Sequence, residues 1–346
     1  MVRDHGFHQV RITRIIQETA DTCTYVLDAP FSYRAGQFLT FRVCGTLRSY
    51  SMSSSPDTED ELMMTVKRVP GGVISNWVHD HLAPGDLIEA TLPAGVFCLR
   101  ENPAPLVAFA GGSGVTPIVS LAKSALATTS RQVRVLTANR DADSIIFSAT
   151  LTELAERYPG RFEVRYHLDI QHGFVTDSVV RDFTGGDRDA DFYICGPAPL
   201  MDLTERALLA HGVDASQIFI ERFEHAGDDQ AGDDQAGDDQ AGDDQAGDGT
   251  AGQEKEGTIS IVLAGQRHTI AQHSGETLLE SARRAGLSPP FSCEAGNCAT
   301  CIAQVTDGEA KMRTNNALDD DEVADGWVLT CQGEPVTPHV TVVYED

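Results

Sequence analysis

One stretch of the sequence is unsuited to any folded core, and it constrains how the rest can fold. Residues 226–250 repeat the letters AGDDQ four times in succession and continue as AGDGT. Glycine, aspartate and glutamine bury too little apolar surface to offset the entropy lost on folding, and a five-residue unit is too short for a solenoid repeat. We interpret residues 226–256 as an acidic, self-repelling linker. It either tethers parts that must move relative to each other or is a repeat expansion without a role.

The charge balance narrows the function. The chain has 52 acidic and 26 basic residues, which gives a formal net charge of −26. Nucleic-acid binding requires basic patches, so we expect no nucleic-acid partner. An acidic surface suits docking onto a basic patch of a partner protein, but it is equally compatible with simple solvation. No apolar run approaches the roughly 20 residues of a membrane span, and the N-terminus lacks the apolar core of a signal peptide. We therefore expect a cytoplasmic protein without a membrane span, and we take it to be monomeric.

Residues 1–103 consist of short strand-like segments separated by turns such as Gly71-Gly72 and Pro84-Gly85-Asp86. Short strands with frequent turns predict an antiparallel barrel, and one helix fits near Ile74–Leu82. The expected strands are Val10–Ile16, Thr24–Leu27, Gln37–Val43, Met63–Val69 and Leu87–Thr91.

In residues 104–225, strand-like and helix-like segments alternate. Such alternation predicts an α/β domain with a parallel sheet. The expected strands are Leu106–Ala110, Val133–Ala138, Phe162–His167, Asp191–Cys195 and Ile218–Ile220. The expected helices are one that begins at Pro117, Ser148–Tyr158 and Pro197–His211.

Four of the eight cysteines gather near the C-terminus. Cys293, Cys298 and Cys301 follow the spacing C-x4-C-x2-C, and Cys331 stands alone further on. This is the plant-type [2Fe–2S] spacing, in which one loop brings three thiolates around two irons. Small residues such as Gly296 let that loop wrap closely. Structural zinc is the alternative, but zinc sites usually pair two short knuckles and only one is present. We predict that all four cysteines are cluster ligands.

The segment PFSCEAGNCATC, with LTCQ further on, resembles plant-type ferredoxins. The resemblance implies a β-grasp fold for residues 257–346. A probable-hairpin pattern over Thr258–Leu263 and Arg267–Ala271, followed by a helix around Thr277–Ala285, agrees with that expectation.

Arg48-Ser49-Tyr50-Ser51 matches the R-x-Y-S motif of the ferredoxin reductase superfamily. An arginine fork suits a pyrophosphate, a tyrosine ring can lie against an isoalloxazine face, and a serine hydroxyl can reach the flavin N5. The motif alone is short enough to be an ordinary strand end. The next residue, Met52, stands where the superfamily often has leucine.

Support comes from Gly71-Gly72-Val73-Ile74-Ser75, where glycines precede a helix N-terminus, an arrangement that binds anions. The resemblance implies that this stretch holds the flavin phosphates, and VKRVPGGVISNW looks more like the FAD-binding members than the FMN-binding ones. The expected flavin contacts are Arg48, Ser49, Tyr50, Ser51, Gly72, Val73 and Ser75.

Gly111-Gly112-Ser113-Gly114-Val115-Thr116-Pro117 follows a strand and opens a helix, the context of a dinucleotide pyrophosphate loop. It departs from G-x-G-x-x-G but matches the GGxGxTP loop of the superfamily. Proline is tolerated in the first helical turn because that N–H has no helical partner. The expected contacts are Gly111, Gly112, Gly114 and Thr116.

Cys195-Gly196-Pro197 closes another strand, and ligands bind at the carboxyl ends of strands in open α/β sheets. The resemblance implies that all three residues contact the nucleotide, with Cys195 beside the nicotinamide; a buried structural thiol is the alternative. Around residues 139–144 an acid would favour NADH and an arginine a 2′-phosphate. Both types occur, Arg140 among them, and we favour NADH over NADPH.

Phe223 ends the segment before the linker. The resemblance implies an aromatic ring that covers the flavin face which the nicotinamide must occupy, whereas a core-facing aromatic is the alternative. Direct roles in hydride transfer are therefore expected for Tyr50, Ser51, Cys195 and Phe223.

The order of flavin barrel, nucleotide domain and C-terminal ferredoxin is that of oxygenase reductases. Over nearly the whole chain, this sequence looks most similar to the reductases of 3-ketosteroid 9α-hydroxylase and phenylacetyl-CoA epoxidase. The resemblance implies electron transfer from NADH (or NADPH) through FAD and the [2Fe–2S] cluster to a terminal oxygenase of Rieske or di-iron type. Another aromatic or alkane oxygenase is an alternative partner. A redox sensor, whose cluster reports and does not relay, is the alternative from a different class.

Overall fold

The computed structural model describes residues 7–44, 46–223, 257–263, 265–287, 289–291, 296, 300–315, 317–318 and 320–344. The chain forms two compact units, one of residues 7–224 and one that contains residues 225–346. The predicted linker, residues 226–256, lies outside the described residues.

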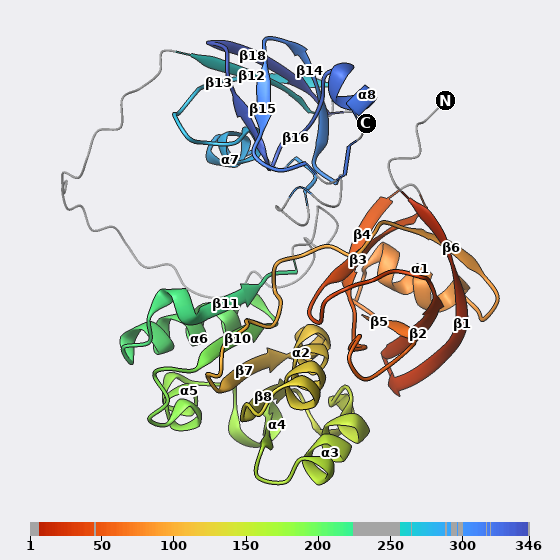
Figure 1. Ribbon diagram of the computed structural model, residues 1–346, viewed down its shortest axis with the longest axis vertical. Coiled ribbons are helices and arrows are strands. Elements are labelled where there is room, and N and C mark those ends of the chain that lie inside the picture. Colours follow the sequence, from red (N-terminus) through yellow and green to blue (C-terminus); the bar gives the residue numbers. More distant parts are fainter. Residues whose placement is uncertain are drawn as a thin grey trace. The chain divides into compact units, whose positions relative to one another are not determined.

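The first part of the larger unit is an antiparallel sheet with the strand order β4-β3-β6-β1-β2-β5 (Figure 1). Met52, directly after β4, forms an antiparallel bridge with Met64 of β5. Both side chains are buried, and their bridge joins the two edge strands, so the sheet closes as the predicted barrel. The elements are β1 His8–Thr19, β2 Thr22–Asp28, β3 Phe38–Val43, β4 Thr46–Ser51, β5 Leu62–Lys67, β6 Leu87–Ala90 and α1 Val73–His81.

The second part of this unit is a parallel sheet with the strand order β11-β10-β7-β8-β9, flanked by helices (Figure 1). The parallel α/β fold predicted from the sequence is confirmed. The strands are β7 Leu106–Gly111, β8 Val133–Asn139, β9 Phe162–Leu168, β10 Asp191–Cys195 and β11 Ile218–Glu221. The helices are α2 Val115–Thr128, α3 Ser148–Arg157, α4 Asp169–His172, α5 Asp177–Thr184 and α6 Ala198–Ala210, with short 3₁₀ turns at Gly112–Gly114, Ala142–Ser144 and Ala215–Gln217.

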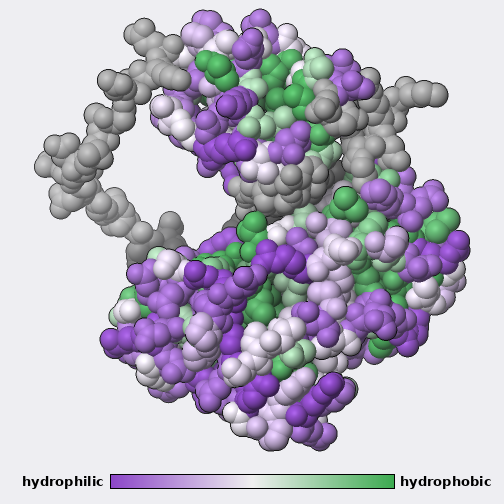
Figure 2. All heavy atoms as spheres, in the orientation of Figure 1, coloured by the Kyte–Doolittle hydropathy of each residue, from purple (hydrophilic) through white to green (hydrophobic). Residues whose placement is uncertain are grey.

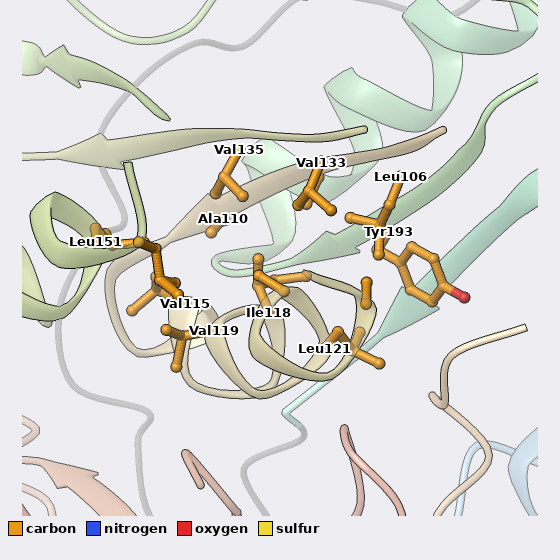
Figure 3. Close-up of a cluster of buried hydrophobic side chains, with 14 of the residues drawn as sticks. Leu106, Ala110, Val115, Ile118, Val119, Leu121, Val133, Val135, Leu151 and Tyr193 are labelled. Atoms are coloured by element: carbon orange, nitrogen blue, oxygen red, sulfur yellow. The ribbon is translucent and has the colours of Figure 1, made fainter. Parts of the chain in front are cut away.

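Each face of the parallel sheet has its own hydrophobic core. Leu106 and Ala110 of β7 join Ile118 of α2 on one face (Figure 3), while Val107 and Phe109 pack on the other face with helices α5 and α6. Alternate residues of a strand point to opposite faces, so the continuous apolar run of β7 serves both cores. The sheet is therefore covered on both sides, as parallel sheets usually are.

Helices α4 and α5 were not predicted. Only Val179, Val180 and Phe183 mark an apolar side of α5, and valine is a weak helix former. Helix α2 also begins two residues before Pro117, which is its third residue.

The smaller unit contains a mixed sheet with the strand order β13-β12-β18-β14-β16, in which β12 and β18 are parallel. Helix α7 begins at a capping box between Thr277 and Glu280, and Leu278 and Ala282 pack into the sheet's core. This arrangement agrees with the predicted β-grasp fold. The elements are β12 Thr258–Leu263, β13 Gln266–Ala271, α7 Leu278–Arg284, β14 Ile302–Asp307, β15 Ala310–Met312, α8 Asp320–Ala324, β16 Trp327–Leu329, β17 Gly333–Pro335 and β18 His339–Val343.

The surface is mostly polar on the face shown in Figure 2, where hydrophilic side chains (purple) cover much of both units. Among the helices that the structure describes, none is both long and apolar enough to cross a membrane.

Candidate functional site

The two predicted nucleotide motifs meet at one point of the parallel sheet. Strand β7 ends at Gly111 and β10 ends at Cys195, and these neighbouring strands pair Ala110 with Cys195. From β7 the chain continues to β8 and β9 on one side, and later to β10 and β11 on the other. This is the topological switch point, where open α/β sheets bind ligands.

Glycines are required because the two motifs touch through their backbones. A Cβ on Gly114 would lie 2.2 Å from the carbonyl oxygen of Cys195, and one on Gly196 would lie 2.8 Å from the amide nitrogen of Gly111. A Cβ on Gly111 would lie 2.7 Å from Cδ of Pro197. The sequence suggests that these glycines let a ligand approach the backbone closely. The structure shows a further reason, because at these three positions a side chain would clash with the neighbouring loop.

The start of α2 suits a polar ligand group. The hydroxyl of Thr116 is buried, and it has no hydrogen-bond partner among the described residues. It lies in the first turn of a fourteen-residue helix, where backbone N–H groups also lack helical partners. Donors gathered at a helix N-terminus attract anions. The residues present therefore fit a dinucleotide at this loop.

Cys195 is a neutral thiol. It is fully buried in the core that α2 shares with the sheet. Burial raises the pKa of this thiol well above its usual range, and the negative charge of Glu221 raises it further. This full burial agrees with the alternative of a structural thiol, so the place of Cys195 beside the nicotinamide stays a prediction. A neutral thiol cannot act as a thiolate nucleophile.

The loop after β8 holds an acid and an arginine in one small network. Asp141 accepts a hydrogen bond from the backbone N–H of Ser144 (2.9 Å), and Nε of Arg140 donates to the same carboxylate (2.9 Å). The hydrogen bond from Arg140 is the main cause that lowers the pKa of Asp141. The acid is therefore ionised and already engaged, while the arginine side chain is 73% exposed.

The R-x-Y-S motif occupies β4, which pairs with β3. Period-two alternation puts Arg48 and Tyr50 on one face and Ser49 and Ser51 on the other. The hydroxyl of Ser49 is hydrogen-bonded to Thr40 of β3 at 2.8 Å, and Ser51 is buried. Burial raises the pKa of Tyr50 to about 12, which the positive charge of Arg48 opposes. The motif therefore presents a cation beside a neutral phenol.

The predicted phosphate loop also has the expected form. Gly71 has φ +76, a conformation that favours glycine, and Gly72 precedes the first turn of α1 in an extended conformation. Val73 is 59% exposed. The Ser75 hydroxyl accepts a hydrogen bond from the amide of Val69 at 3.1 Å, and it retains its proton for donation. The open helix N-terminus fits an anionic ligand.

Phe223 is partly buried against the core that contains Val115 and Cys195. This placement agrees with the alternative of a core-facing aromatic, and the role of Phe223 as a cover for the flavin stays a prediction.

Lys67 is a candidate site residue that the sequence motifs do not indicate. This last residue of β5 belongs to the barrel, yet its Nζ lies 3.8 Å from the position of a Cβ on Gly112. The ammonium is also 3.8 Å from a carboxylate oxygen of Asp21. Gly112 has φ +53, and apart from its chain neighbours and the backbone of its own 3₁₀ turn, this lysine nitrogen is the one described heavy atom within 4 Å of that Cβ position. The barrel thus brings a cation to the nucleotide loop, which no spacing in the sequence indicates.

In the smaller unit, two of the four predicted cluster ligands are described, and they lie in one buried cluster. Cys301 and Cys331 are 2% and 6% exposed and share a core with Leu279 and Leu329. The backbone N–H and the hydroxyl of Thr330 both donate to the carbonyl of Cys301, at 3.1 and 2.9 Å. Cys293 and Cys298 lie outside the described residues.

The loop around these cysteines also fits a bound cluster. Gly296 has φ +76, and a Cβ there would lie 2.7 Å from the carbonyl oxygen of Thr314. The buried hydroxyl of Thr300 has no partner among the described residues. The left-handed Gly296 and the spare donor of Thr300 are therefore compatible with an iron–sulfur centre, whose sulfurs accept hydrogen bonds.

Comparison with known proteins agrees with this geometry. Residues 9–98 match the oxidoreductase FAD-binding domain family, residues 109–206 the oxidoreductase NAD-binding domain family, and residues 261–336 the 2Fe-2S iron-sulfur cluster binding domain family. The chain is 33% identical to the ferredoxin reductase component of 3-ketosteroid-9-alpha-monooxygenase from Rhodococcus rhodochrous, over 98% of each chain. It is 28% identical to a component of 1,2-phenylacetyl-CoA epoxidase from Escherichia coli (strain K12), again over 98% of each. Among solved structures, phthalate dioxygenase reductase matches with a TM-score of 0.61 at 24% identity, over 98% of each chain.

The fold and the grouped motifs define an oxidoreductase that carries FAD-binding, NAD-binding and [2Fe–2S] domains. The chain belongs to the family of oxygenase reductase components that join these three domains on one polypeptide. The predicted family, fold class and cofactors are thereby confirmed, and the protein functions in electron transfer.

Proposed function

We propose that this protein takes electrons from NADH and delivers them, one at a time, to a terminal oxygenase. When bound, FAD would supply the chemistry that links a two-electron hydride donor to a one-electron [2Fe–2S] cluster. The observation that carries the proposal is the approach of Lys67 of the barrel to Gly112 of the nucleotide loop. This contact brings the flavin domain and the nucleotide loop together, as hydride transfer requires.

The chain's own residues divide the work. Arg48, Tyr50, Ser49 and Ser51, with the loop at Gly72, Val73 and Ser75, would bind and orient FAD. Gly111, Gly112, Gly114 and Thr116, together with Lys67, Gly196 and Pro197, would hold the dinucleotide. The neutral Cys195 would lie beside the nicotinamide. When no nicotinamide is bound, Phe223 would cover the flavin face and exclude water from it. Cys293, Cys298, Cys301 and Cys331 would hold the cluster.

The preference for NADH is supported by the loop after β8. The guanidinium of Arg140 is paired with Asp141, so a 2′-phosphate would have to compete with an existing ion pair. Comparing kcat/KM for NADH and NADPH tests this directly. A higher kcat/KM for NADPH than for NADH would contradict the preference. In that case Arg140→Ala should lower kcat/KM for NADPH.

The proposed partner is a terminal oxygenase, because relatives are named as components or subunits of monooxygenases and of an epoxidase. Within that class we propose a Rieske or di-iron oxygenase. A 3-ketosteroid 9α-monooxygenase is the first candidate, and a phenylacetyl-CoA epoxidase or another aromatic or alkane oxygenase is the second. Reconstitution with each purified oxygenase, measured as NADH-dependent product formation, distinguishes them. We further propose a monomer that works in the cytoplasm, where NADH is available.

We propose domain limits of 1–103 for the FAD barrel, 104–225 for the nucleotide domain, 226–256 for the linker and 257–346 for the ferredoxin domain. Limited proteolysis within 226–256 should release two fragments that keep flavin and cluster respectively.

An anaerobic NADH titration, followed by visible absorption and low-temperature EPR, tests the electron path. Flavin bleaching together with a rhombic [2Fe–2S] signal is expected. Flavin bleaching without reduction of a cluster that is present would contradict the internal relay and favour a redox sensor.

A further inference from the structure

A band of buried polar groups joins the barrel to helix α2. On the barrel side it consists of Ser53, Ser54 and Ser55, which come shortly after β4, and on the α2 side of Ser120, Lys123 and Ser124. We call these six residues the serine seam. All five serines are at most 2% exposed, so the seam lies inside the larger unit and not on its surface.

The contacts across the seam are directional hydrogen bonds. The Ser120 hydroxyl donates to the carbonyl of Ser54 at 2.5 Å, and the hydroxyls of Ser55 and Ser124 are 2.7 Å apart. The ammonium of Lys123 donates to the carbonyl of Ser53 at 3.1 Å. Buried polar groups are costly when unpaired, so the two sides are stable in one register only.

The ammonium of Lys123 also pairs with the carboxylate of Glu59. The side chains of Lys123 and Glu59 are 13% and 23% exposed. Glu59 in turn accepts a hydrogen bond from the backbone N–H of Ser55 at 2.9 Å. The charged pair therefore extends the same network and holds the segment after β4 in a turn.

The barrel side of the seam is itself braced. The hydroxyls of Thr65 and Ser53 are 2.9 Å apart, and those of Thr65 and Thr24 are 2.8 Å apart. The Thr24 hydroxyl lies 2.7 Å from a carboxylate oxygen of Glu18. This series of hydrogen bonds runs across β5 and β2. The strands of the barrel, and not a free loop, therefore fix the position of Ser53.

Helix α2 has two different faces. Ile118 and Leu121 pack into the core against the parallel sheet, as Figure 3 shows. The residues at i, i+3 and i+4, namely Ser120, Lys123 and Ser124, share another face and meet the barrel. Apolar side chains on that face would bury the helix equally well. They would, however, let α2 slide along the barrel, because the hydrophobic effect is non-directional.

The seam also lies next to both ligand motifs in the chain. Ser53 is two residues after Ser51 of the flavin motif, and Ser120 is one helical turn after Thr116 of the nucleotide loop. At about 3.3 Å per extended residue and about 1.5 Å per helix residue, the two paths are about 7 Å and about 6 Å long. If the seam residues moved, the flavin motif and the nucleotide loop would therefore move by a similar distance.

We propose that the serine seam sets the distance and angle between flavin and nicotinamide, so that Lys123, Ser120, Ser124 and Glu59 are positioning residues for hydride transfer. This inference rests on the proposed flavin and nucleotide contacts. Hydride transfer depends steeply on geometry, and a misplacement of about 1 Å can cost about a hundredfold in rate. Binding of either ligand alone does not require the two motifs to be aligned.

The test compares the full-length holoprotein with Lys123→Met and Ser124→Ala, and uses Lys311→Met as the matched control. Lys311 is the exposed central residue of β15 in the other unit. Stopped-flow absorbance gives the rate of flavin reduction at saturating NADH, calorimetry gives the affinity for ADP-ribose, and denaturation gives the flavin content. For Lys123→Met we expect a rate about tenfold lower and a weaker flavin–nicotinamide charge-transfer band. ADP-ribose affinity should stay within about twofold and flavin content should be unchanged.

Lys123→Arg, which keeps the cation, should recover part of the rate. If Lys123→Met loses its flavin or aggregates, Ser124→Ala, which deletes one hydroxyl, decides by the same criteria. A saturating rate equal to that of the control in the flavin-replete variant would overturn the inference and leave the seam a purely structural contact. A wild-type protein whose flavin is not reduced by NADH would instead overturn the proposed function, so the two failures are distinguishable.

Discussion

The cluster loop and the hydride-transfer region hold their redox groups in opposite ways. In the smaller unit, three of the four proposed ligands lie within Cys293–Cys301, and the chain itself sets their spacing. In the larger unit, the proposed contacts come from strand ends and helix starts that are far apart in the sequence, such as Lys67, Gly112 and Cys195. A site whose ligands lie close together in the chain can therefore be identified from their spacing. A site built from distant segments depends on the long-range contacts that align those segments.

Cys331→Ser should separate the two regions most strongly. Loss of one thiolate removes the cluster, so electron delivery to an oxygenase or cytochrome c should be abolished. NADH-dependent reduction of ferricyanide, which needs only the larger unit, should continue at the wild-type rate. Steady-state assays of both reactions check this, with Cys23→Ser as the control thiol. Loss of both activities would show that the two regions are not separable.

Gly114→Ala attacks the contact between the two nucleotide motifs. The added Cβ would lie 2.2 Å from the carbonyl oxygen of Cys195, so one loop must move away. Because reactivity depends on ångström-scale alignment, kcat/KM for NADH should fall about a hundredfold or more. Gly186→Ala is the control, since no described heavy atom beyond its chain neighbours lies within 4 Å of its Cβ position. Equal kinetics in the two variants would refute the close-approach argument.

Arg131→Ala should destabilise the larger unit alone. Arg131 and Asp191 form an ion pair at 2.7 Å, with side chains 1% and 3% exposed. Without Arg131, the buried Asp191 keeps a longer ion pair with the half-exposed Arg100, at 3.8 Å. We therefore expect a loss of about 3 kcal/mol, at the lower end of the range for a broken buried ion pair. Denaturant unfolding followed by flavin fluorescence should show this loss, while the visible circular dichroism of the cluster stays unchanged. Arg181→Ala breaks an exposed pair with Asp177 and should cost no more than about 1 kcal/mol.

Lys67→Met tests whether the barrel contributes to nucleotide binding. Loss of a charge-assisted contact to a phosphate should raise KM for NADH about tenfold, with little change in kcat. The dependence of KM on ionic strength should also weaken. A KM and a salt response like those of wild type would place Lys67 outside the nucleotide site and leave it as a partner of Asp21 only.

Of these substitutions, Tyr50→Phe should have the smallest effect, because it should leave the pH dependence of flavin reduction unchanged. Burial raises the pKa of Tyr50 to about 12, although Arg48 opposes the shift. A group with a raised pKa keeps its proton throughout the ordinary working range, so the phenol stays neutral between about pH 6 and pH 9. The pH profiles of flavin reduction should therefore coincide for wild type and variant in that range. Profiles that diverge above about pH 8 would reveal a phenolate in the wild-type protein.

Elements with strong local patterns were predicted well. Strand β10 has the predicted bounds, Asp191–Cys195, because five buried residues in a row bounded by a glycine-proline pair leave little alternative. The glycine loop was placed correctly between β7 and α2 for a similar reason. Helix α5 was missed because only Val179, Val180 and Phe183 mark its apolar side, and valine is a weak helix former.

The sequence by itself determined the chemical identity of the site. Cysteine spacing, the R-x-Y-S motif and the glycine loop each have a local physical reason, namely ligand geometry or backbone conformation, that can be recognised without knowing the fold. Tertiary structure alone decided how these motifs are aligned. Met52 closes the barrel on Met64, Lys67 reaches the loop at Gly112, and α2 docks on the serine seam. These contacts join residues far apart in the chain, and their hydrogen bonds and charges act over a few ångströms, so they exist only once the folded backbone brings the residues together.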